Sequence, residues 1–187
     1  MINQNTFIIF DFETGGLGLT KEDYTPIQVA AIALDPRTLV KKGEFSSMMK
    51  PINYNKVSDK ALEINKKTRK EILEAPDEKI VWGDFVSFVN RFNKSKKRFT
   101  APIACGQNII NFDLPIAQTL CEVHGHDYSN LFHSHILDTL NISFLWFESR
   151  KEPSRYGMDP MRDFLGIPKE GAHDALVDVK HTALLLT

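Results

Sequence analysis

The sequence predicts an α/β fold in which a mixed sheet of five strands is flanked by helices. Three segments near the N-terminus are rich in β-branched and aromatic residues, and they follow one another closely enough to form an antiparallel meander. After them, amphipathic helical segments alternate with two short apolar strands, an order typical of α/β domains. Strands first, then alternating helices and strands, therefore indicate one sheet with strands in both directions.

Length and composition fit a single globular domain over residues 1–187. The chain is 42% hydrophobic and carries a formal net charge of −1, so no overall basic field points to a nucleic-acid partner. Cys105 and Cys121 are too few for a disulfide framework, which indicates a reducing compartment. Neither a signal peptide nor an apolar run of membrane-spanning length is evident, and we expect a cytoplasmic protein without a membrane partner.

The first strand, over residues 7–14, ends in two acidic residues and a Gly-Gly turn. Side chains alternate along a strand, so Ile9, Asp11 and Glu13 share one face, and Phe10 and Phe12 share the other. Two acids on one face are costly to bury unless a cation neutralises them, and carboxylate oxygens suit Mg²⁺ or Mn²⁺. Taken alone, such a pair is more often a strand end that meets solvent.

The remaining elements follow from periodicity and end signals. Residues 17–25 form a polar loop, and residues 27–34 and 43–49 are the second and third strands. Further strands are expected over 103–106 and 136–139. Helices are expected over 58–65, 80–92, 112–123, 139–147, 159–166 and 173–187. A further short helix is expected to begin at Thr68, where the sequence has capping-box spacing. Asp159 and Pro160 are assigned as N-cap and first residue of their helix.

Two charged groups outside the strands have competing interpretations. The basic cluster could touch a phosphate backbone, but a solvated face is favoured for its members, Lys66, Lys67, Arg69 and Lys70. Two H-x-H pairs suggest a zinc site, but nothing positions one pair against the other, and a solvated connection is preferred for His124, His126, His133 and His135.

Three further residues join the acids of the first strand. Asp113 stands at a helix start just after the strand over 103–106. His173 falls at or just before the N-terminus of the last helix, and Asp178 lies about one turn inside it, near enough to face the same site. Each of these residues is ordinary by itself, since Asp113 could be an N-cap and His173 a loop histidine.

Together, the patterns D-x-E-T, N-x₃-F-D and H-x₄-D resemble those of the DEDD superfamily of 3′→5′ exonucleases, in its histidine-bearing DEDDh (DnaQ-like) branch. The resemblance covers nearly the whole chain, and its motifs are similar to those of ribonuclease T, exonuclease I and polymerase proofreading domains. It implies a ribonuclease H-like fold and hydrolysis of nucleic acid from the 3′ end. Asn108 stands five residues before Asp113, where many members have four, so either Asn108 or Asn111 takes the place of the family asparagine.

The same residues suit phosphodiester cleavage chemically. Two divalent cations, Mg²⁺ or Mn²⁺, can clamp the attacking and leaving oxygens, and their expected ligands are Asp11, Glu13, Asp113 and Asp178. Histidine, with an ordinary pKa of about 6.5, is suited to take the proton of the attacking water, a role assigned to His173. The resemblance further implies that the terminal nucleotide meets Thr14, Gly15, Gly16, Leu17 and Asn108, while Asp138 is expected to be structural.

The predicted function is a metal-dependent 3′→5′ exonuclease that hydrolyses single-stranded DNA to nucleoside 5′-monophosphates. An exoribonuclease of the same branch is a close alternative, because no motif reports contact with a 2′-hydroxyl. The alternative from another class is a non-catalytic nucleic-acid-binding module tethered to a polymerase. The apolar run 184–187 carries no helix stop signal, so we expect the chain to continue into a longer polypeptide.

Overall fold

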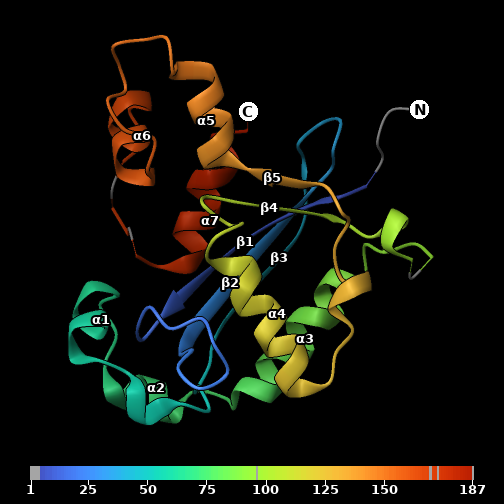
Figure 1. Cartoon of the computed structure of the whole chain (residues 1–187), viewed down its shortest axis with the longest axis vertical. Coiled ribbons are helices and arrows are strands. Elements are labelled where there is room, and N and C mark those ends of the chain that lie inside the picture. Colours follow the sequence, from blue (N-terminus) through green and yellow to red (C-terminus); the bar gives the residue numbers. More distant parts are fainter. Residues whose placement is uncertain (1–4, 96, 169, 172, 187) are drawn as a thin grey trace.

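A five-stranded mixed sheet lies at the centre of the computed structural model, which describes residues 5–95, 97–168, 170–171 and 173–186 (Figure 1). The strand order is β3-β2-β1-β4-β5. The pairs β1–β2 and β2–β3 are antiparallel, whereas β4 runs parallel to both β1 and β5. The strands span Phe7–Thr14 (β1), Pro26–Leu34 (β2), Lys41–Met48 (β3), Ile103–Gly106 (β4) and Ile136–Asp138 (β5). The predicted meander and mixed sheet are thereby confirmed.

Helices cover both faces of this sheet. Helices α3 and α4 contribute to the core on one face, and α7 packs across β1 and β2 on the other (Figure 1). Two short helices, α1 and α2, lie beyond the end of β1, and α5 and α6 follow β5. The helices span Asp59–Ile64 (α1), Arg69–Glu74 (α2), Glu78–Asn90 (α3), Asp113–His124 (α4), Thr139–Phe147 (α5), Met158–Leu165 (α6) and Ala175–Leu184 (α7).

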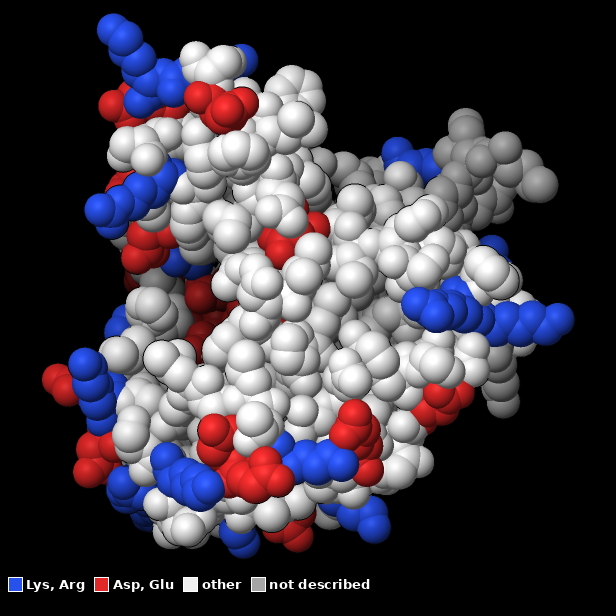
Figure 2. Space-filling model, viewed as in Figure 1, with Lys and Arg blue, Asp and Glu red and all other residues white. Residues whose placement is uncertain are grey.

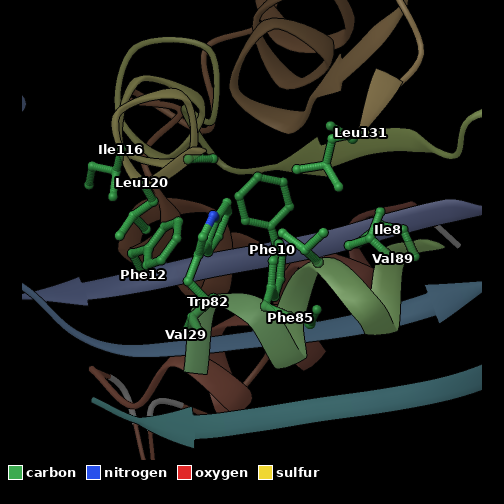
Figure 3. Close-up of a cluster of buried hydrophobic side chains, with 14 of the residues drawn as sticks. Ile8, Phe10, Phe12, Val29, Trp82, Phe85, Val89, Ile116, Leu120 and Leu131 are labelled. Carbon is green, nitrogen blue, oxygen red and sulfur yellow. The ribbon is translucent and has the colours of Figure 1, made fainter. Parts of the chain in front are cut away.

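An aromatic core fills the space between β1 and the helices α3 and α4 (Figure 3). Phe10 stacks on Phe132, with ring centroids 5.3 Å apart, and Trp82 stacks on Phe85 at 4.9 Å. Stacked and edge-to-face aromatic pairs add to the free energy gained from burial alone. This core fixes β1, and therefore the position of the acids that it carries on its opposite face.

The alternation predicted for β1 is confirmed. Ile8, Phe10 and Phe12 belong to the aromatic core, while Ile9 packs in the second core with Ala175 and Val179 of α7. Asp11 and Glu13 follow Ile9 at intervals of two, so they lie on the face of the sheet that α7 covers.

The helix after residue 157 begins earlier than predicted. Helix α6 starts at Met158 with Gly157 as its N-cap, so the assignment of Asp159 as N-cap and Pro160 as first residue is wrong. Proline is tolerated anywhere in the first turn, because no backbone N–H is needed there. The Asp159 carboxylate accepts a hydrogen bond from Arg162 at 2.9 Å and caps nothing. The last helix ends at Leu184, and Thr187 lies outside the described residues.

One histidine of the two H-x-H pairs and one lysine of the basic cluster are buried, although a solvated position was predicted for both groups. His124, whose side chain is 4% exposed, lies 2.8 Å from Glu78 Oε1, an oxygen that also accepts from the Tyr24 hydroxyl. Lys67, with a side chain 15% exposed, pairs with Asp174. Both corrections have one cause, since burial brought about by distant segments is invisible in local sequence.

Candidate active site

Three carboxylates converge where β1 ends beneath α7. Ligand oxygens of Asp11, Glu13 and Asp178 all lie within 4.8 Å of one another. Among the described residues, no other group of three acidic, histidine or cysteine side chains is this close. We call these three residues the carboxylate cluster.

Helix α7 is oriented by its own N-cap. The Asp174 side chain accepts hydrogen bonds from the amides of Leu176 and Val177, which fixes the first turn of the helix. Ala175 and Val179 are buried against the sheet. Asp178 lies one residue before Val179, on the side of the helix that reaches β1, and so meets Asp11 and Glu13.

Asp113, the fourth predicted ligand, approaches the cluster from α4. Its side chain is 2% exposed, and its Oδ1 accepts a hydrogen bond from the Phe12 amide at 2.9 Å. Phe12 stands between Asp11 and Glu13, so this bond ties the start of α4 to the acidic end of β1. Asp113 is outside the group of oxygens within 4.8 Å, but its charge acts on Asp11.

Crowding of negative charge raises the pKa values of these acids. Burial, together with the charges of Asp113, Glu13 and Asp178, raises the pKa of Asp11 well above its ordinary value. Burial and Asp178 raise the pKa of Glu13 to about 7, although the Lys67 ammonium opposes this shift. Burial likewise raises the pKa of Asp113, against the hydrogen bond from Phe12. Such a site favours protons or metal cations that neutralise it.

Arg162 is a site residue that the sequence analysis missed. Its side chain is 1% exposed, and its Nη2 donates to Asp178 Oδ1 at 2.5 Å. Its Nε donates to His181 Nδ1 at 2.9 Å, and its charge lowers the pKa of Asp11. In the sequence, the burial of Arg162 is indicated only by its place directly after the apolar Met161 of α6. That place does not distinguish it from a surface arginine.

A cavity of about 620 Å³ adjoins the carboxylate cluster. Its lining combines polar groups near Glu13 with apolar side chains from the β1 turn, α1 and the start of α4, among them Leu17, Ile64 and Phe112. Figure 2 shows a recess between the surface formed by α5 and α6 and the surface formed by α1, with acidic side chains at its back. Because Glu13 lines the cavity, the cavity reaches the carboxylate cluster.

Sequence comparison places the chain among nucleases. Residues 8–186 match the family model described as exonuclease, RNase T type. The chain belongs to this exonuclease family. No curated protein matches the sequence.

Solved structures of exonuclease I share the fold of this exonuclease-family chain. A structure of the Escherichia coli enzyme in complex with a dT13 oligonucleotide has a TM-score of 0.80 at 22% identity, over 98% of this chain and 40% of that one. A complex of exonuclease I with SSB-Ct has a TM-score of 0.76 at 20% identity, over 98% and 40% of the two chains. The chain thus spans about 40% of the length of these exonuclease I structures. Among the described residues, no helix has both the length and the apolar character needed to cross a bilayer.

The glycine turn of this family member is shaped by packing within the protein. A Cβ atom on Gly15 would lie 2.8 Å from a methyl group of Val57, so only glycine fits. The Gly15 amide donates to Thr25 O at 2.7 Å, and the Thr14 hydroxyl donates to Gly16 O at 2.6 Å. Gly16 and Leu17 line the cavity, and the Leu17 side chain is 86% exposed there.

Asn108 and Asp138 together build the turn after β4. Asn108 has a positive φ of 58°, a conformation that asparagine tolerates better than most residues. Its amide donates to Asp138 Oδ1 at 2.9 Å, and the Ile110 amide donates to Oδ2 of the same carboxylate at 3.2 Å. The Asn111 side chain donates to Asn108 Oδ1. This geometry agrees with the structural role expected of Asp138.

His173 lies outside the carboxylate cluster, immediately before the N-cap of α7. It is exposed, and its φ of 67° falls in the left-handed region. The structure thus brings Asp11, Glu13 and Asp178 together, places Asp113 beside them, and leaves His173 at the entry to the helix that carries Asp178.

Proposed function

We propose that this chain is a metal-dependent 3′→5′ exonuclease of the DEDDh branch, which hydrolyses single-stranded DNA to nucleoside 5′-monophosphates. The observation that carries the proposal is the carboxylate cluster beside an open cavity, in a chain of the exonuclease family. Four acids converging around β1 have no evident role in a protein that only binds nucleic acid, and raised pKa values of buried carboxyl groups are typical of catalytic sites.

The donor set fits divalent cations. All the donors are carboxylate oxygens, which Mg²⁺ and Mn²⁺ prefer, and the mutual repulsion of the acids would be relieved by positive charge. Asp11, Glu13 and Asp178 would hold the first cation, and Asp113 would complete a site for a second. When bound, such ions supply charge stabilisation for the pentavalent phosphorus and for the leaving 3′-oxygen.

The chain's own residues orient the substrate and move the proton. His173 accepts the proton of the attacking water through its imidazole, a role open to an exposed side chain next to α7. Backbone groups at Gly16 approach the terminal nucleotide, while Leu17, Ile64 and Phe112 cover its base. The apolar part of the cavity lining suits a nucleotide base that is desolvated on both faces.

Single-stranded DNA is the preferred substrate in this proposal because related folds are seen with it. Exonuclease I has been solved with dT13 and dA16 oligonucleotides, and this chain matches 40% of the length of each of those structures. An exoribonuclease of the same branch is the second candidate, since no motif of the sequence reports contact with a 2′-hydroxyl. A polymerase-tethered module that binds without cleaving is the third.

A gel assay tests the reaction, its direction and its sugar preference together. The protein is incubated with 5′-labelled single-stranded DNA and RNA of one sequence, in Mg²⁺, Mn²⁺ or EDTA. A metal-dependent ladder that shortens from the 3′ end, faster on DNA, is the expected result. Faster cleavage of RNA would favour the exoribonuclease, and retention of both strands uncut would favour the binding module. Asp11→Asn serves as the inactive control.

A further inference from the structure

Asp174 is bound by groups from three parts of the fold. Besides capping α7, its Oδ2 accepts hydrogen bonds from Gln28 Nε2 at 3.1 Å and Lys67 Nζ at 3.2 Å. Gln28 lies on β2 and Lys67 lies between α1 and α2. Although burial acts in the opposite direction, these two partners bring the pKa of Asp174 below its ordinary value, so the carboxylate is charged.

Lys67 is unusual among the lysines of its segment. Its side chain is 15% exposed, whereas that of Lys70, three residues on, is 81% exposed. A lysine with so little exposure requires an anionic partner, and Asp174 supplies it. The Lys67 charge also reaches Glu13, whose pKa it lowers against the effect of burial. Lys67 therefore lies between the carboxylate cluster and the N-terminus of α7.

Gln28 joins the same contact from the sheet. It pairs with Glu13 across β1 and β2, its side chain is 5% exposed, and its Oε1 has no hydrogen-bond partner among the described residues. A buried amide oxygen without a partner costs free energy, so the orientation of Gln28 is set by what its nitrogen binds, namely Asp174.

The backbone immediately before Asp174 needs such fixing. His173 has a φ of 67°, which disfavours residues with a Cβ atom, and it is exposed, so packing alone does not hold it. The Asp174 amide donates to Gly171 O at 3.2 Å, which closes the turn that contains His173. Asp174, which ends this turn, is thus the residue that Lys67 and Gln28 bind.

We propose that Lys67 and Gln28 are positioning residues that hold Asp174 and, through it, fix the position of His173 immediately before α7, the helix that carries Asp178. This inference rests on the proposed function, because it gives His173 the role of general base. Lys67 links the α1–α2 region, which borders the cavity, to α7, which carries Asp178. The ion pair therefore spans the two sides of the active site as well as fixing the histidine.

The decisive variants change Lys67 in the natural sequence and in a protein that also carries His173→Ala. Lys67→Met removes the charge and keeps the length of the side chain, and Lys67→Arg restores a cation. The matched control is Lys42→Met, which breaks a Lys–Asp pair of 2.6 Å with Asp35 at the β3 edge of the sheet, far from the cluster. Each is made in the natural sequence and in a His173→Ala protein, and kcat and KM are measured on single-stranded DNA.

The expected result is a roughly tenfold lower kcat for Lys67→Met with KM changed less than twofold, recovery by Lys67→Arg, and no effect of Lys42→Met. In the His173→Ala protein, Lys67→Met should change kcat less than twofold, because the group that it positions is gone. An equal loss in both backgrounds, or an effect confined to KM, would overturn the proposal in favour of direct phosphate contact or a general structural role.

Amide hydrogen exchange in EDTA tests the positioning separately from the reaction. Lys67→Met and Asp174→Asn, which retains a capping side chain, should both speed exchange in residues 173–178 and leave α4 unchanged. Unaltered exchange in that segment would reject the positioning role whatever the activity. A natural protein that cuts neither DNA nor RNA would instead refute the proposed function, with the exchange result still deciding whether Lys67 holds the turn.

Discussion

The guanidinium of Arg162 and the carboxylate of Asp178 form a close ion pair inside the site, with Nη2 and Oδ1 2.5 Å apart. Arg162 comes from α6 and Asp178 from α7. Because Asp178 also belongs to the carboxylate cluster, the arginine supplies positive charge at a point where acids repel one another. In the metal-free protein, Arg162 therefore offsets part of the charge that divalent cations would neutralise.

Replacing Arg162 with methionine is expected to destabilise the metal-free protein more than the metal-loaded one. Removing one partner of a buried ion pair costs about 3 kcal/mol, which for a domain of this size lowers Tm by roughly 6–12 °C. Thermal melts in EDTA and in Mn²⁺ provide the measurement, and the ion should recover much of the loss. The control is Asp159→Asn, which removes the exposed partner of the same guanidinium and should change the free energy of unfolding by less than about 0.5 kcal/mol. Equal destabilisation with and without Mn²⁺ would contradict the compensating role.

Stability of the metal-free protein is expected to fall as pH rises from about 4.5 to 7. The folded protein holds the Glu13 proton up to a pKa of about 7, whereas the unfolded chain releases it near 4.5. The contribution is thus fully present below pH 4.5 and lost as pH rises through 7, and its size is on the order of 3 kcal/mol. Urea unfolding in EDTA across this range measures it. Glu13→Gln, which cannot ionise, should make the profile shallower, with the remaining slope due to Asp11 and Asp113, whose pKa values are also raised. A variant profile as steep as the natural one would assign the whole effect to groups other than Glu13.

Loss of the histidine is expected to separate turnover from metal binding. His173→Ala should lower kcat about 10²–10⁴-fold, the usual contribution of a general base, with metal affinity nearly unchanged. Asp11→Ala should weaken the metal affinity itself, because it removes a predicted ligand from the cluster. Calorimetric titration with Mn²⁺ beside single-turnover kinetics distinguishes the two variants. If His173→Ala lost as much metal affinity as Asp11→Ala, the general-base role would be wrong.

The cavity lining is expected to contribute to substrate binding through Leu17. This side chain is 86% exposed in the free protein, and covering it with a nucleotide base would bury apolar surface. Leu17→Ala should therefore raise KM for oligonucleotides about five-fold, equivalent to about 1 kcal/mol. Leu73→Ala is the matched control, since that leucine is 50% exposed on α2 and does not line the cavity. Equal KM values for the two variants would remove Leu17 from the binding site.

Local patterns were enough to predict the sheet, whereas the convergence of the acids was expected from the resemblance to the DEDDh exonucleases. The alternation along β1 predicted the face shared by Asp11 and Glu13, and helical spacing predicted only that Asp178 lies near His173. The strand over 103–106 and the capping box at Thr68 were predicted equally well, because each depends on neighbouring residues only. Both features are determined by residues that are close together in the sequence.

The cations of the site escaped prediction because their partners lie far away in sequence. Within its own segment, Lys67 does not differ from the other lysines of the basic cluster. Its burial depends on Asp174, which lies more than a hundred residues later in the sequence. Arg162 is buried because α6 packs near α7, which no periodicity within α6 reports. Gly15 was expected to approach the terminal nucleotide, and the packing reason for a glycine there, a Cβ position 2.8 Å from Val57, was not foreseen because Val57 lies 42 residues later.

The position of α7 has a consequence for when the protein acquires its chemistry. Asp11 and Glu13 precede Asp178 in the chain by more than 160 residues, and Asp178 reaches them only when α7 packs across β1 and β2. A nascent chain therefore carries the first two acids without the third until α7 has been synthesised and has docked. Docking of α7 is thus the step that assembles the carboxylate cluster in a newly made chain.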